Sequence, residues 1–149
     1  MRNVVRYGYL GLAWFLFADL CMQFYFAAYG VFSTAAADFG YHSRNAQLLL
    51  VVMVVTLAVA VVAAFLRLLP WTRVLLQLVL PVLLLAQLGL FLLQHALGGT
   101  MEHPVSWLLG LHGLNGVLML LLSLRLALLV SRRPVSAREP EAGEMVPAK

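Results

Sequence analysis

Residues 46–69 read AQLLLVVMVVTLAVAVVAAFLRLL, and this stretch decides the fold class. It is long enough to cross a membrane as a helix, because about 30 Å of hydrocarbon takes roughly 20 apolar residues. A strand is excluded because the run does not alternate polar and apolar residues, and because an open sheet leaves backbone hydrogen bonds unmade in lipid. The stretch therefore predicts a transmembrane helix.

Three further runs of the same kind predict four spans in all. The composition agrees, because 63% of the 149 residues are apolar and 11% are charged, against about 45–50% and about 25% in soluble domains. It excludes a soluble globule, a disordered regulator and a nucleic-acid binder. We predict an all-α four-transmembrane-helix bundle, made of two tandem helical hairpins, in one domain of residues 1–133, followed by a disordered cytoplasmic tail over residues 134–149. The predicted spans are about 7–32, 46–69, 74–97 and 105–130.

Basic residues gather at one end of the predicted spans. With both termini in the cytoplasm, only Arg44 of the ten basic residues falls on the outer side, as the positive-inside rule requires. The net charge of +4 therefore indicates orientation rather than a nucleic-acid partner. We predict a multi-pass protein of the bacterial cytoplasmic (inner) membrane whose main partner is the lipid bilayer. The inner basic residues are Arg2, Arg6, Arg67, Arg73, Arg125, Arg132, Arg133, Arg138 and Lys149.

A short pattern occurs twice in the chain. Residues 42–50 read HSRNAQLLL and residues 112–120 read HGLNGVLML, so both read His-x-x-Asn-small-x-Leu-x-Leu. Gln23 precedes the first copy and Gln94 precedes the second at nearly the same spacing. Because His, Asn and Gln are scarce in this chain, we interpret the matches as two copies of one hairpin, related by an axis along the membrane normal. The alternative is chance similarity between Leu-rich segments.

The repeat predicts that His42 and His112 approach each other across the axis. Two neutral imidazoles that face one another in an apolar bundle are the axial ligands of a six-coordinate haem b. Ala46 and Gly116 follow the two histidines at i+4 and would leave room for the porphyrin ring. The hypothesis is a haem site for electron transfer or haem handling, with His42 and His112 as the metal ligands.

Two asparagines complete the predicted haem site. Asn45 and Asn115 would position the ligands or form hydrogen bonds between helices. The alternative is that the His, Asn and Gln cluster only locks the bundle by such hydrogen bonds. The protein would then be a non-catalytic accessory or assembly subunit of a membrane complex, or a homo-oligomer.

Other polar residues inside the spans point to further alternatives. Asp19 lies near the middle of the first span, where a carboxyl group is costly and serves either transport or a hydrogen bond to a neighbour such as Gln87. Gln87 and Gln94 share one face of the third span and form a polar stripe. A small transporter that uses Asp19 is therefore a third hypothesis. No phosphate-binding loop, nucleophile elbow or paired-carboxylate motif occurs, so we predict no enzyme activity.

Residues 111–116 read LHGLNG, and this motif resembles an uncharacterised bacterial domain-of-unknown-function family of small four-helix membrane proteins. The resemblance extends from about Val5 to Val130. It includes a Gln near the end of helix one and a His before helix two, with Ala46 in place of the Gly that the family tends to have. It implies four helices and the importance of His42, His112, Asn115 and Gly116, and it implies no particular activity.

Overall fold

Four helices make up the structure, a computed structural model that describes residues 2–33, 39–100 and 103–132. The predicted all-α four-helix bundle is confirmed. The predicted tail, residues 134–149, lies outside the described residues. The helices are α1 (Arg2–Phe32), α2 (Phe39–Phe65), α3 (Trp71–Ala96) and α4 (Ser106–Ser131).

The bounds of α2 differ from those of the predicted span. The helix begins at Phe39, seven residues before the apolar run, and ends at Phe65, four residues before the end of that run. Hydropathy marks where a chain meets hydrocarbon, whereas a helix also continues through polar interfacial residues such as Arg44. His42 therefore lies inside α2, about one turn after its first residue.

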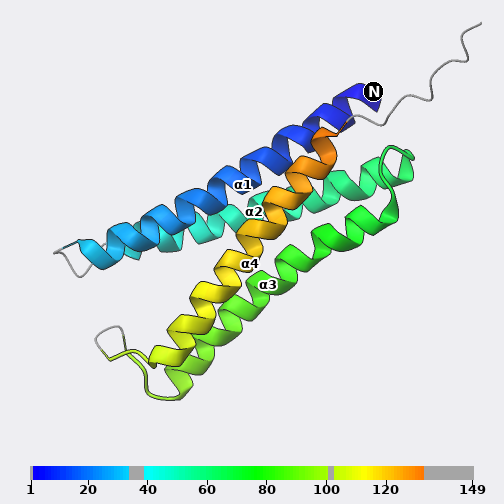
Figure 1. Cartoon of the computed structure of the whole chain (residues 1–149). Coiled ribbons are helices and arrows are strands. Elements are labelled where there is room, and N and C mark those ends of the chain that lie inside the picture. Colours follow the sequence, from blue (N-terminus) through cyan, green and yellow to red (C-terminus); the bar gives the residue numbers. More distant parts are fainter. Residues whose placement is uncertain (1, 34–38, 101–102, 133–149) are drawn as a thin grey trace, which may run out of the picture.

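The helices occupy the corners of a square in which α1 contacts α2 and α4, and α3 also contacts α2 and α4. The diagonal pairs, α1 with α3 and α2 with α4, have no Cα atoms within 8 Å of each other among the described residues. In Figure 1 the two hairpins meet where α1 begins and α4 ends, and they separate toward the opposite end. We call these the termini end and the loop end of the bundle.

All four helices are long and apolar enough to cross a membrane. The shortest have 26 residues, about 39 Å at the helical rise and more than the roughly 30 Å of hydrocarbon. Their outward faces carry exposed leucine, valine and phenylalanine, which suits contact with lipid rather than water. The chain is therefore a multi-pass membrane protein.

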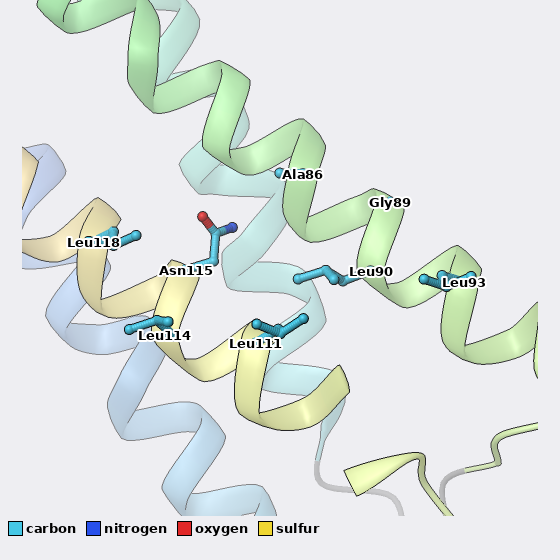
Figure 2. A pocket seen from close by; sticks show the side chains of 8 residues that line it. All are labelled: Ala86, Gly89, Leu90, Leu93, Leu111, Leu114, Asn115 and Leu118. Carbon is cyan, nitrogen blue, oxygen red and sulfur yellow. The ribbon is translucent and has the colours of Figure 1, made fainter. Parts of the chain in front are cut away.

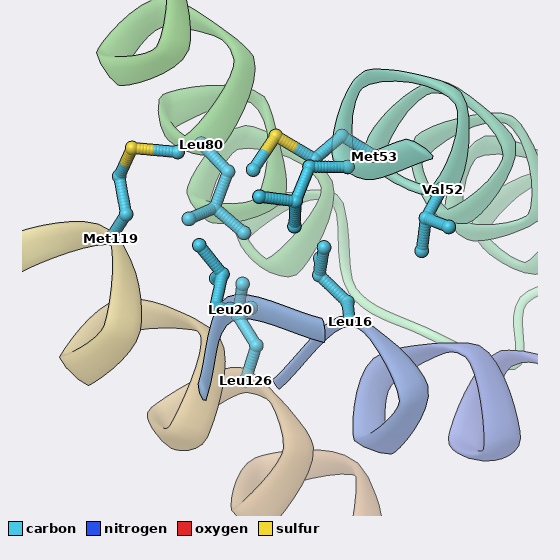
Figure 3. Packing of buried hydrophobic residues seen from close by; sticks show 8 residues of the cluster. Leu16, Leu20, Val52, Met53, Leu80, Met119 and Leu126 are labelled. Atoms are coloured by element: carbon cyan, nitrogen blue, oxygen red, sulfur yellow. The ribbon is translucent and has the colours of Figure 1, made fainter. Parts of the chain in front are cut away.

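The apolar core joins the two hairpins at mid-height. Figure 3 shows leucine and methionine side chains of all four helices converging there, among them Leu20, Met53, Leu80 and Met119. A second cluster at the termini end contains Tyr9 and Val74, packed against Ala60 and Ala64. Since lipid is as apolar as leucine, this core holds the bundle by close packing rather than by exclusion of water.

The ends of α2 and α3 share one capping motif. After α2, the amide of Leu68 donates to the carbonyl of Ala63 (2.8 Å), and the amide of Arg67 donates to that of Ala64 (2.9 Å). This Schellman pattern requires a left-handed residue, and Arg67 has φ of 57°. α3 ends in the same way, with Gly98 at φ of 76°. Arg67 thus occupies a position that favours glycine.

Substituting Arg67→Gly is expected to stabilise the bundle by about 1 kcal/mol, because glycine adopts left-handed backbone without the Cβ clash. Titration with sodium dodecyl sulfate, followed by circular dichroism, measures the change. Gly98→Ala is the matched control and is expected to destabilise the bundle by a similar amount. A loss of stability in Arg67→Gly would mean that the guanidinium group contributes more than its backbone strain costs.

Candidate functional site: a His, Asn and Gln cluster

Gln23 organises the polar contacts of the first hairpin. Its Nε2 donates to the backbone oxygen of His42 (3.1 Å) and lies 3.2 Å from His42 Nε2. His42 Nδ1 lies 3.2 Å from the backbone oxygen of Gln23. Asn45 Nδ2 donates to Gln23 Oε1 (2.9 Å) and to the backbone oxygen of Asp19 (3.2 Å). These bonds join α1 to α2 in the half of the bundle nearer the loop end.

Gln87 has the corresponding contacts in the second hairpin. Its Nε2 donates to the backbone oxygen of His112 (2.9 Å). Asn115 Nδ2 donates to Gln87 Oε1 and to the backbone oxygen of Leu83, both at 2.8 Å. In each hairpin a glutamine amide thus donates to the backbone carbonyl of a histidine. An asparagine amide donates to the side-chain oxygen of this glutamine, and also to the backbone carbonyl one helical turn before the glutamine. We call each set of bonds an amide clamp.

The structure corrects the predicted counterpart of Gln23, which is Gln87 and not Gln94. Gln94 is buried at the loop end of α3, and its side chain forms no hydrogen bond with the described residues. Gln23 lies 19 residues before His42, whereas Gln87 lies 25 before His112. The extra residues belong to a longer connection between α3 and α4 and to the helix ends beside it. Equal spacing along the sequence therefore selected the wrong glutamine.

The two histidines lie close together although no described Cα atoms of α2 and α4 approach within 8 Å. The ring centroids of His42 and His112 are 6.3 Å apart, with the ring planes at 51°. Both side chains are half-buried. No hydrogen bond to the His112 ring is found among the described residues, in contrast to the His42 ring. The rings therefore meet across the α2–α4 diagonal, between the two amide clamps.

Phe24 lies beside this pair. A Cβ added to Gly116 would be 3.2 Å from Phe24 Cζ, so the phenyl ring contacts the backbone of α4 at that glycine. Ala46 lies at the corresponding place on α2 and is half-buried. The space that the sequence assigned to a porphyrin edge beside Gly116 thus holds a phenyl ring.

Asp19 is buried and only partly satisfied. The residue is only 5% exposed, and its carboxyl oxygen Oδ2 has no hydrogen-bond partner among the described residues. The predicted neighbour Gln87 is engaged in its own amide clamp. Gln77 was not predicted as a site residue, yet it is fully buried and both of its amide atoms lack a described partner. Only its place in the core distinguishes Gln77 from the other glutamines of α3.

Metal-binding clusters of conventional composition are not found. Among residues 2–33, 39–100 and 103–132, no three His, Cys, Asp or Glu side chains lie close enough to hold an ion. A metal held by His42 and His112 would therefore need its other ligands from elsewhere, as a porphyrin provides.

Comparisons of the chain with known protein families, with curated proteins and with solved structures find no match.

Proposed function

We propose that this membrane protein binds haem b through His42 and His112 and serves electron transfer or haem handling. The observation that carries the proposal is the 6.3 Å separation of the two ring centroids across the bundle. Metal–imidazole bonds of about 2 Å put two axial nitrogens about 4 Å apart, and so the ring centroids roughly 6 Å apart. The bound haem would supply one-electron chemistry at its iron.

The hydrogen bonds of His42 suit a metal ligand. Ligating histidines almost always donate their other ring N–H to a carbonyl or carboxylate, which fixes the tautomer and the ring orientation. His42 Nδ1 lies 3.2 Å from the backbone oxygen of Gln23, which leaves Nε2 as the ligating atom. The amide of Gln23 would give up its contact with Nε2 and keep its bond to the backbone oxygen of His42.

A haem held by His42 and His112 would need room that side chains at the site now partly fill. Phe24 would have to turn away from Gly116, since its ring now contacts that helix. The proposal therefore requires that Phe24 adopt another rotamer.

We also propose an orientation of the bundle in the membrane and an origin of its two hairpins by duplication. Described basic residues flank the termini end, with Arg2, Arg67, Arg73 and Arg132 among them. By the positive-inside rule both termini would lie in the cytoplasm of a bacterium, and the haem would lie toward the outer leaflet. The two matching amide clamps support a duplicated hairpin, in which His42 and His112 are equivalent positions.

A visible absorption spectrum tests the proposal. Protein purified after expression with ample haem is expected to show a Soret band, and the His42→Ala and His112→Ala variants are expected to lose it. His95→Ala is the matched control, because His95 is an exposed histidine near the loop end of α3, and it should keep the band. A wild-type protein without the band, or a band that survives both ligand variants, would overturn the assignment.

The second candidate is a purely structural role for the cluster, in an accessory or assembly subunit. It is favoured by the amide clamps, whose hydrogen bonds join α1 to α2 and α3 to α4. In that case the protein shows no Soret band and the His42→Ala and His112→Ala variants differ from the wild type only in stability. Transport through Asp19 is the remaining alternative, supported by the unpartnered Oδ2 of its buried carboxyl group.

A further inference from the structure

A groove lies on the lipid-facing side of the second hairpin. It has a volume of about 410 Å³ and runs between α3 and α4. Figure 2 shows Leu90 and Leu93 of α3 across from Leu111 of α4, with Asn115 directed from α4 toward α3. Leu111 and Leu93 are exposed, so the groove opens toward the bilayer. Its size is within the range of about 300–1,000 Å³ that is usual for ligand sites.

The first hairpin closes the corresponding surface with its own side chains. When the amide clamps are aligned, Gly89 and Leu90 correspond to Tyr25 and Phe26, and Leu93 corresponds to Tyr29. Together with Tyr41 of α2, the counterpart of Leu111, these three aromatic residues form a ring of contacts. The centroid separations are 5.5 Å for Tyr25–Phe26, 6.4 Å for Tyr25–Tyr29, 5.9 Å for Phe26–Tyr41 and 6.2 Å for Tyr29–Tyr41. The groove is therefore not a necessary result of hairpin geometry.

Gly89 is the residue that keeps the groove open. A Cβ added to it would meet no atom within 4 Å. Its counterpart in the first hairpin is a tyrosine, which is the largest difference between the two sets of residues. Glycine is tolerated inside a transmembrane helix because neighbouring groups satisfy its backbone hydrogen bonds. At Gly89, however, no side chain of a neighbouring helix fills the space that a larger residue would occupy.

Asn115 is the one polar residue among those that line this groove. The residue is 9% exposed, and both of its described hydrogen bonds use Nδ2 as the donor. Its Oδ1 therefore has no hydrogen-bond partner among the described residues. An amide oxygen accepts hydrogen bonds, so a matching occupant must present a donor at this point and apolar surface along the rest of the groove.

We propose that the groove between α3 and α4 binds a membrane-soluble molecule with an apolar chain and a hydroxyl group, whose O–H donates to Asn115 Oδ1. The site faces hydrocarbon, so its occupant comes from the membrane. A plain acyl chain would fill the leucine-lined part and leave the amide oxygen unpaired, at a cost that the hydroxyl removes. The inference does not depend on haem binding, because it uses neither the His42 nor the His112 ring.

Photo-crosslinking with a matched pair of probes tests this site. The probes are a diazirine-bearing hexadecanol and its methyl ether, in which a methyl group replaces the hydroxyl proton. The protein is held in phosphatidylcholine nanodiscs. Mass spectrometry is expected to find the alcohol on Leu90, Leu93 and Leu111. The ether is expected to label them about five-fold less, the factor that one neutral hydrogen bond provides. This comparison leaves the protein unchanged.

Two glycine variants complete the test. Gly89→Phe should abolish labelling of the groove, because it imitates the filled first hairpin and its Cβ meets no atom within 4 Å. Gly11→Phe is the control, since Gly11 lies on α1 in equally open space, and it should label like the wild type. Equal labelling by alcohol and ether, labelling that persists in Gly89→Phe, or cross-links from this groove to a second copy of the chain would overturn the proposal.

Discussion

Replacing Gln87 by leucine is expected to destabilise the bundle by about 1 to 3 kcal/mol. The change removes the donor to the backbone oxygen of His112 and the acceptor for Asn115 Nδ2, while the side-chain volume stays similar. Side-chain hydrogen bonds between transmembrane helices average about 0.6 kcal/mol and reach about 1.7 kcal/mol. Loss of two such bonds, in a hairpin that depends on them, gives the stated range. Unfolding in sodium dodecyl sulfate measures the difference.

Gln94→Leu is the matched control for Gln87→Leu. Both glutamines lie on α3, both are at least half-buried, and they share a helix face seven residues apart. Gln94 makes no side-chain hydrogen bond with the described residues, and its amide atoms, unlike those of Gln77, are not among the fully buried unpaired atoms. Its replacement is therefore expected to change stability by no more than about 0.5 kcal/mol. Equal losses in the two variants would contradict the assignment of the second amide clamp to Gln87.

Replacing Gln77 by leucine is expected to have the opposite effect and to stabilise the bundle by about 1 to 3 kcal/mol. The residue is fully buried, and neither Oε1 nor Nε2 has a described partner. An unpaired buried amide costs about that amount, and leucine has a similar volume without the polar atoms. The same detergent titration measures the gain. Replacement by leucine is thus expected to lower the stability of the bundle at Gln87 and to raise it at Gln77.

The control for Gln77→Leu is Thr56→Val on α2. Thr56 is also fully buried, but its hydroxyl donates to the backbone oxygen of Val52 at 2.6 Å. Removing this satisfied hydroxyl is expected to lower stability slightly or leave it unchanged. If Gln77→Leu proves less stable than the wild type, then the Gln77 amide has a hydrogen-bond partner in the membrane, such as a buried water molecule.

The number, type and order of the helices were predictable from the sequence because hydrocarbon demands long apolar helices. The start of α2 was not, since residues from Phe39 to Asn45 are helical without being strongly apolar. His42, His112, Asn45 and Asn115 stood out because polar residues are rare in these spans. The choice of Gln87 over Gln94 depends on the length and path of the α3–α4 connection, for which hydropathy contains no signal.

The burial of Gln77 could not be predicted for a different physical reason. Periodicity places it about 80° from Gln87 around α3 and so leaves it at the edge of the polar stripe. Its full burial results from the way that α3 packs against α2 and α4, which is a property of the assembled bundle. The groove beside Asn115 is of the same kind, because it depends on Gly89 facing open space between two helices.

The amide clamps also have a consequence for biosynthesis. Nearly every described hydrogen bond between helices joins α1 to α2 or α3 to α4, and the bond from Trp14 Nε1 to Ser131 Oγ (3.0 Å) is the exception. A ribosome delivers the first pair of helices to the membrane before the second. Each pair can therefore close its own polar contacts on leaving the translocon, and the late step of assembly is the docking of two finished, apolar surfaces.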